Sequence, residues 1–224
     1  MIPAREIFPK DGWPAPIARI FAGRFVTLTP LNPDADVDEL FRGSHEPASV
    51  DAMWRHVAAG PFADAAAMRE WLRAQQALPD MIPFTVTDNA TGRRIGSISL
   101  MRITPAHGVA ELGFIWYEPA AQRTKANTEA NYLLLRHCFD DLGYRRMEWK
   151  CNAENERSRA AALRLGFSFE GIFRQHLVIK GRNRDTAWFA MLDHEWPRIA
   201  AAMEHWLYVD DSQPLAARSA ETAR

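Results

Sequence analysis

The chain has 224 residues, of which 47% are apolar and 25% charged, so it can bury a substantial core and fits one domain with extensions better than two domains. Its formal net charge of -1 gives no polybasic signature, and we therefore expect neither a nucleic acid nor a membrane surface as its partner. Two cysteines, Cys138 and Cys151, with no second pair for a framework, indicate a reducing compartment and thiols that pack as small hydrophobic groups.

Residues 1–20 are expected to form an extended arm, because Pro3, Pro9, Pro14 and Pro16 interrupt any continuous helix or central strand. This segment also lacks the apolar region of a signal peptide, and no run of about 18 apolar residues occurs in the chain. We expect a cytoplasmic protein.

The next part of the chain predicts alternating strands and helices. Val26 and Leu28 alternate with polar residues as in a strand, and the acidic residues after them suit the first turn of a helix. The predicted elements are a strand over 24–31, a helix from about 34 to 43, a helix capped by Asp64 and running to Leu78, and strands over 84–88 and 95–102 joined by a turn at 88–92.

The segment from Glu111 to Phe167 is the most informative part of the sequence. It predicts a strand over 111–117, a polar, basic loop over 118–129, a helix over 130–144, and a strand over 145–152. A turn with the spacing Asn155-x-x-Ser158 then opens a short Ala-rich helix. The free N–H groups of a helix's first turn, together with the helix dipole, favour anions, so the basic loop indicates a phosphate-bearing cofactor.

The C-terminal part predicts a hairpin and a final helix. The hairpin strands cover 171–180 and 184–192, and the helix covers 194–207. The whole pattern predicts an α/β (α+β) fold with a mixed sheet and helices on both faces. We expect a single domain over residues 21–207, followed by a polar tail over 208–224 that is disordered.

The order of these elements and several motifs resemble the GNAT N-acetyltransferase superfamily, closest to its RimJ/RimL-like branch. The resemblance runs from about Arg24 to Leu192. The motifs that carry it are Glu111-Leu112-Gly113, Trp116-x-x-Pro119, Gln122, Thr128-Glu129-Ala130, Asn155-x-x-Ser158 and Leu165-Gly166-Phe167.

The resemblance implies a splayed strand pair that holds the pantetheine arm of acetyl-CoA, or of another acyl-CoA, while the loop and the helix after it hold the pyrophosphate. It implies cofactor-binding roles for Gln122, Arg123, Thr124, Lys125, Asn127, Thr128 and Asn155. It also implies that Ser158 positions or protonates the departing thiolate, and that Glu111 is a base acting directly or through a water.

The cofactor loop departs from the family pattern. The family usually has Gln/Arg-x-x-Gly-x-Gly/Ala here, whereas Lys125 and Asn127 stand where small residues are expected. Glycine permits positive φ and a close approach of the backbone to phosphate, a freedom that Lys125 lacks. Either the segment binds the anion in a modified way, or cofactor binding is weakened or lost.

Other interpretations of the same residues stay open at this point. Glu111 is equally well explained as a carboxylate that pairs with Arg or Lys, and Asn155 and Ser158 also fit an ordinary helix start. Glu148 is a second candidate base, and Cys151 is best explained as a buried structural cysteine. No ligand spacing indicates a metal site.

The sequence thus predicts an N-acyltransferase that moves acetyl from acetyl-CoA to a primary amine by direct attack in a ternary complex. The acceptor is a small molecule or a protein N-terminus, and the segment from His45 to Phe62 is expected to supply part of its pocket. The alternative is a noncatalytic acyl-CoA-binding module or a degenerate domain that acts through protein contacts. The eight tryptophans and the apolar final helix make a homodimer plausible.

Overall fold

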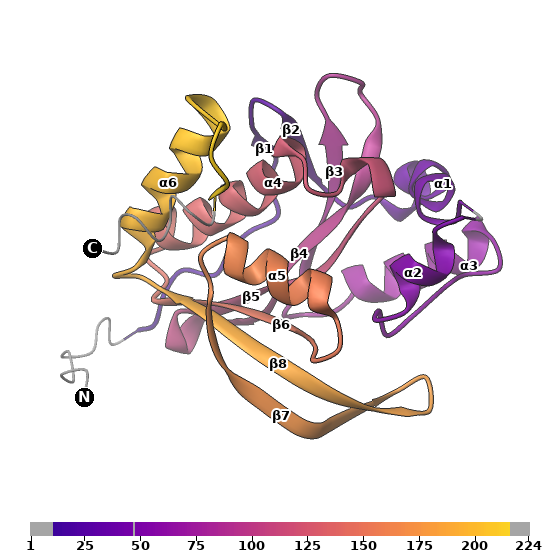
Figure 1. Cartoon of the computed structure of the whole chain (residues 1–224). Coiled ribbons are helices and arrows are strands. Elements are labelled where there is room, and N and C mark those ends of the chain that lie inside the picture. Colours follow the sequence, from indigo (N-terminus) through magenta and orange to yellow (C-terminus); the bar gives the residue numbers. More distant parts are fainter. Residues whose placement is uncertain (1–10, 47, 216–224) are drawn as a thin grey trace.

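The computed structural model describes residues 11–46 and 48–215. They form one eight-stranded sheet in the order β1-β2-β3-β4-β5-β6-β8-β7, flanked by helices (Figure 1). The strands are β1 (Phe21–Ala22), β2 (Val26–Pro30), β3 (Ile82–Asp88), β4 (Arg94–Thr104), β5 (Val109–Tyr117), β6 (Arg146–Asn152), β7 (Ser168–Ile179) and β8 (Arg182–Leu192). The helices are α1 (Pro33–Ser44), α2 (Val50–Trp54), α3 (Ala65–Gln76), α4 (Lys125–Arg136), α5 (Glu156–Arg164) and α6 (Trp196–Tyr208).

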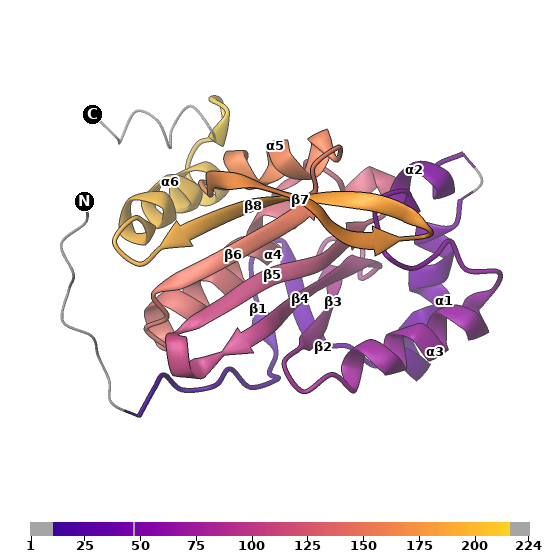
Figure 2. The ribbon, with the colours of Figure 1, turned by 90° about the horizontal axis from the view of Figure 1, so that it is seen from below.

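The helices lie on both faces of the sheet, as predicted. Figure 2 shows α5 and α6 on one side and α1 and α3 on the other. The larger core cluster joins the sheet to α4, α5 and α6 through residues such as Leu134, Ala162 and Ile199. The smaller cluster, which includes Leu40, Trp54 and Met68, lies under α1, α2 and α3. The mixed α/β architecture inferred from the sequence is therefore confirmed.

Strands β5 and β6 form the parallel pair of the sheet and separate after a short ladder. Their pairing comprises Val109 with Arg146, Ala110 with Met147, and Glu111 with Glu148. Beyond this point β5 continues to Tyr117 and β6 to Asn152 without pairing to each other. A bulge at Phe114, whose φ is 49°, shifts the register of β5 against β4 and bends the strand. The two strands thus diverge and leave backbone groups available between them.

Most predicted elements are present, but the start of α4 was predicted wrongly. The sequence placed 118–129 in a loop, whereas the helix begins at Lys125 with the side chain of Thr124 as its N-cap. The reason is a tertiary contact: Glu129, fully buried, accepts hydrogen bonds from the backbone N–H groups of residues 24–26. That contact fixes the first turns of α4 against β2, which a local pattern does not reveal.

The two ends of the chain are described in part. Residues 12–20 of the expected arm contain no helix or strand, and Trp13 donates a hydrogen bond to the carbonyl of Gly143 at 2.6 Å. Of the predicted tail, Tyr208 completes α6 and Leu215 is buried. Residues 1–10 and 216–224 lie outside the described residues.

Candidate active site

The N-terminus of α4 presents backbone N–H groups that have no partner inside the helix. Thr124 Oγ1 accepts from the N–H of Asn127 at 3.3 Å, which leaves the amides of Lys125 and Ala126 without an intrahelical acceptor. Arg123, just before the cap, has a left-handed backbone with φ 63°. The residue that needs positive φ is therefore Arg123, and Lys125 lies in the helix, where a side chain causes no backbone strain.

Two arginines meet beside this helix terminus. Arg164, at the end of α5, donates to Thr128 Oγ1 at 2.9 Å and makes a longer contact of 3.5 Å to Asn127 Oδ1. Burial lowers the pKa of Arg164, and the nearby charge of Arg123 lowers this pKa further. Within the described residues no carboxylate forms an ion pair with either arginine. Two cations, two polar side chains and a helix N-terminus together form an environment suited to a phosphate group.

Lys125 points away from these arginines. Its ammonium lies 3.1 Å from Asp211 Oδ2 and within 6 Å of the ring centres of Phe25 and Trp206, at 5.6 and 5.9 Å. The charge of Lys125 is therefore already partnered, and the residue links α4 to the segment after α6. Gln122 also has a local partner, since its Nε2 donates to the carbonyl of Tyr117 at 3.2 Å.

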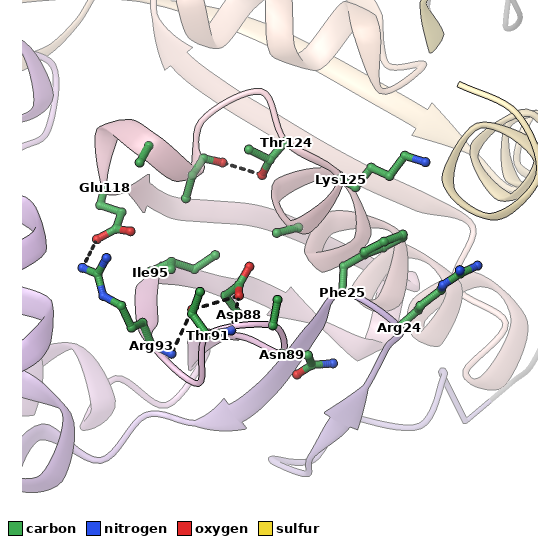
Figure 3. Close-up of a pocket in the computed structure, with 14 residues that line it drawn as sticks. Arg24, Phe25, Asp88, Asn89, Thr91, Arg93, Ile95, Glu118, Thr124 and Lys125 are labelled. Carbon is green, nitrogen blue, oxygen red and sulfur yellow. Dashed lines mark hydrogen bonds and ion pairs between the residues drawn. The ribbon is translucent and has the colours of Figure 1, made fainter. Parts of the chain in front are cut away.

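A hollow lies on the Lys125 side of α4. It has a volume of ≈ 540 Å³, and Figure 3 shows Arg24, Phe25 and Lys125 along one wall, with the ion pair of Arg93 and Glu118 along another. Neither Glu111 nor Ser158 lines it. Because the candidate catalytic groups lie elsewhere, we place the chemistry at the divergence of β5 and β6 instead.

At that divergence α5 carries Ser158 up to β6. Asn155 caps α5, accepting from the N–H of Ser158 at 3.1 Å. Trp149 Nε1 donates to Ser158 Oγ at 3.0 Å, a bond that leaves the hydroxyl hydrogen of Ser158 available. Burial raises the pKa of Cys151, and the hydrogen bond from Ser158 offsets this rise only in part. Cys151 is therefore a buried, protonated thiol.

Glu111 lies on the other face of the sheet within a continuous series of ion pairs. Its side chain is buried, and its Oε2 lies 2.6 Å from Arg102 Nη1 and 3.0 Å from Lys150 Nζ. The series crosses four strands as Arg102, Glu111, Lys150, Glu148, Arg146 and Glu170. The ion pairing that the sequence offered as an alternative for Glu111 is thus formed.

Ser158 and Glu111 approach the strand gap from opposite sides. Residues of a strand alternate between its faces, so Trp149, which holds Ser158, points away from the face of Glu148 and Lys150. Glu111 pairs with Glu148 in the parallel ladder and shares that second face. A hydroxyl on one face and a carboxylate on the other therefore flank the position where β5 and β6 separate.

Some residues of the segment from His45 to Phe62, which was expected to supply part of the acceptor pocket, pack in the protein core instead. Trp54 is fully buried and donates to the carbonyl of Ser44 at 3.1 Å. His45 Nε2 accepts from the N–H of Phe62 at 2.9 Å, and burial lowers the pKa of His45. These contacts are structural. The tip of the β7–β8 hairpin closes the same region, because Lys180 Nζ donates to the carbonyl of Trp54 at 3.0 Å (Figure 2).

Arg164 is the residue at the α4 terminus that the sequence did not single out, since its side-chain partners lie on another helix. In the described part of the chain no group of three or more His, Cys, Asp or Glu side chains is arranged to hold a metal ion. No described helix has the length and apolar character needed to span a bilayer.

Comparisons with known proteins all indicate the same family. The model described as "Acetyltransferase (GNAT) domain" matches residues 26–168. A crystal structure of a GCN5-related N-acetyltransferase from Brucella melitensis is 44% identical, with a TM-score of 0.89, and the alignment covers 93% of this chain and 97% of that one. A probable acetyltransferase of the GNAT family from Chromobacterium violaceum ATCC 12472 is 37% identical, with a TM-score of 0.81 and coverage of 88% and 98%.

Among curated proteins, the ribosomal-protein-serine acetyltransferase of Escherichia coli (strain K12) is 36% identical over 98 residues, which are 44% of this chain and 54% of that enzyme. The chain spans 57% of a second curated relative, YdaF of Bacillus subtilis (strain 168). It therefore covers little more than half of the length of each curated relative.

Proposed function

Because the chain belongs to the GNAT acetyltransferase family and to its RimJ/RimL-like branch, we propose that it transfers acetyl from acetyl-CoA to a primary amine by direct attack in a ternary complex. The observation that carries this proposal is the pair of side chains that flank the strand gap. Ser158 lies on one face of β6 and Glu111 on the other, at the level where the parallel ladder ends.

The residues at the start of α4 fit an acyl-CoA. Arg123 and Arg164, without carboxylate partners in the described chain, receive the phosphates together with Thr124, Asn127, Thr128 and the first-turn amides. Lys125 holds the first turn of α4 to the segment after α6 through its ion pair with Asp211, and Gln122 holds the loop to the end of β5. When bound, the coenzyme supplies the thioester carbonyl that the amine attacks.

Side chains of the protein then transfer the protons and hold the reacting groups in position. Glu111 accepts a proton from the acceptor ammonium, directly or through a water, because an amine attacks only in its neutral form. Arg102 and Lys150 hold the carboxylate in place. Ser158, fixed by Trp149 and by the cap of Asn155, directs its hydroxyl hydrogen to the departing sulfur. Asn155 also contributes to the pantetheine site.

The acceptor is a small-molecule amine or a protein N-terminus. The name of the Escherichia coli relative, ribosomal-protein-serine acetyltransferase, supports a protein as the acceptor.

The test is release of free thiol from acetyl-CoA over a panel of amines and peptides. We expect Glu111→Gln and Ser158→Ala each to lower kcat by roughly 10–100-fold, because each removes one proton-transfer group. Glu148→Gln is the matched control, since Glu148 contacts the same Lys150 but accepts no proton in the proposed chemistry, and kcat should stay within about 3-fold of wild type. Unchanged turnover in both Glu111→Gln and Ser158→Ala would remove these catalytic assignments.

A further inference from the structure

Arg184 on β8 is a desolvated cation that the proposed chemistry does not use. Its Nε is buried and has no hydrogen-bond partner in the described structure, and no described carboxylate forms an ion pair with it. Burial lowers the pKa of Arg184, while Cys151 and Glu111 act in the opposite direction. A buried N–H group without an acceptor is unfavourable, so the Nε of this half-buried side chain calls for a ligand atom that accepts a hydrogen bond.

The acidic groups near Arg184 already have other partners. Glu111 is bound by Arg102 and Lys150. Asp185, the next residue, accepts from the backbone N–H of Gln175 at 2.7 Å and from Asn183 Nδ2 at 3.0 Å. Of the described carboxylates, these two are therefore already engaged by other groups.

Arg184 lies close to charged groups at the strand gap. Arg102 of β4, Glu111 of β5 and Cys151 of β6 all influence its pKa. Arg184 also acts on the pKa of His56, which follows α2. The side chain thus lies among the strand gap, the Glu111 carboxylate and the α2 region.

A second buried donor lies on the same face of β8. Residues 184, 186 and 188 alternate to one side of the strand, and Trp188 Nε1 is also buried without a partner in the described structure. Lys150 Nζ lies 4.0 Å from the centre of the Trp188 ring, which places this ring beside the Glu111 network. Arg and Trp side chains only donate hydrogen bonds, so a ligand on this face must bring acceptor atoms.

We infer that Arg184 binds a carboxylate of the acceptor, so that the enzyme acetylates primary amines that themselves carry a carboxylate. This inference rests on the proposed function. A carboxylate matches the fork of a single guanidinium through two parallel hydrogen bonds. A phosphate usually gathers several cations, whereas nearby Arg102 is already paired with Glu111, and Lys180 already donates to the carbonyl of Trp54.

The test compares free acids with their carboxamides. The probes are the twenty amino acids and ω-amino acids of two to five carbons, each as the acid and as the matched carboxamide. The readout is the ratio of kcat/KM for acid and amide. We expect wild type to favour its best acid by roughly 10–100-fold, and Arg184→Gln to bring the ratio close to one. Carboxamides have a lower amine pKa than the free acids. This difference affects both proteins equally, so it cancels when the acid-to-amide ratio of wild type is compared with that of Arg184→Gln.

Two controls separate this role from others. Arg182→Gln removes the same charge from an exposed position two residues away, and it should keep the wild-type ratio. The Kd for acetyl-CoA, measured by calorimetry, should be unchanged in Arg184→Gln. A tenfold rise in that Kd, or an acid preference that survives in Arg184→Gln, would overturn the inference.

Binding gives a readout that does not need turnover. Thermal shifts are recorded for every probe with CoA present. A stabilisation by acids that is absent with their amides and lost in Arg184→Gln supports the inference even if no thiol is released, and in that case only the proposed transfer fails. If no acid stabilises the protein and none is preferred in turnover, the inference is wrong. Acetylation of amines that lack a carboxylate would still leave the proposed function intact.

Discussion

At the start of α4, Arg164 and Arg123 lie together without a carboxylate in the described chain, and this arrangement makes the sharpest prediction for a single residue. Arg164→Ala removes a half-buried guanidinium that we propose binds phosphate. Its Kd for CoA should rise by roughly 10–100-fold, because hydrogen bonds to charged groups contribute about 1.5–3 kcal/mol. Isothermal titration calorimetry measures the change directly.

Arg157→Ala provides the control, since Arg157 is an exposed cation on the same helix. It should change the Kd by less than about 2-fold, and a similar loss in both variants would show only a general charge effect. Lys125→Ala should also have a small effect on the Kd, because its ammonium pairs with Asp211.

At this scale the sequence predicts some positions well and others poorly. Glu111, Asn155 and Ser158 belong to local motifs, and the structure places all three at the strand gap. Their roles stay predictions. Arg164 is noticed only because no carboxylate of the described chain pairs with it, and a missing ion-pair partner is a property of the packed molecule that no spacing encodes.

Among the elements, α4 shows how tertiary contacts override a local pattern. The missing glycines of its first turn left two predictions open, modified binding of the anion or a changed loop conformation. In the structure that turn is helical, and Glu129 anchors it to the backbone of β2 and to Tyr208 of α6, whose hydroxyl donates at 2.8 Å. Because these partners lie 103–105 and 79 residues from Glu129 along the chain, composition alone did not predict where the helix begins.

Strand β6 carries an electrostatic prediction. Burial opposes ionisation of Glu148, but the hydrogen bonds from Lys150 and Arg146 outweigh it, so the pKa of Glu148 lies below its usual 4.5. A carboxylate whose folded-state pKa is depressed stabilises the fold above the unfolded pKa, and this stability is lost as the pH falls through the folded value. Wild type should therefore lose more stability below about pH 4.5 than Glu148→Gln does.

The measurement is urea unfolding of both proteins between pH 3 and pH 7. At pH 7, Glu148→Gln should be less stable by roughly 1–3 kcal/mol, and this difference should shrink as the pH falls below about 4.5. Glu170→Gln, at the more exposed end of the same series, should cost only about 0–1 kcal/mol. A Glu148→Gln difference that stays constant with pH would contradict the ion-pair account.

For the whole molecule, periodicity and turn composition predicted the architecture because the strands and helices repeat at 2.0 and 3.6 residues. The two-residue β1 and the five-residue α2 escaped prediction, since segments so short show no period. The β7–β8 turn is also tighter than predicted, with Lys180 and Gly181 both at positive φ. A homodimer stays a prediction. Edge strand β7, with Phe169, Ile172 and Phe173 exposed, is the surface that would suit it.

The account as a whole requires the coenzyme to cross the sheet between β5 and β6 with its phosphates at the start of α4. A crystal structure grown with excess CoA tests this most directly. We predict phosphate oxygens within hydrogen-bond distance of Arg123 and Arg164, and the sulfur between the two strands beside Ser158. A gap filled by side chains with no density for nucleotide, or phosphates bound instead in the hollow between Phe25 and Arg93, would contradict the account.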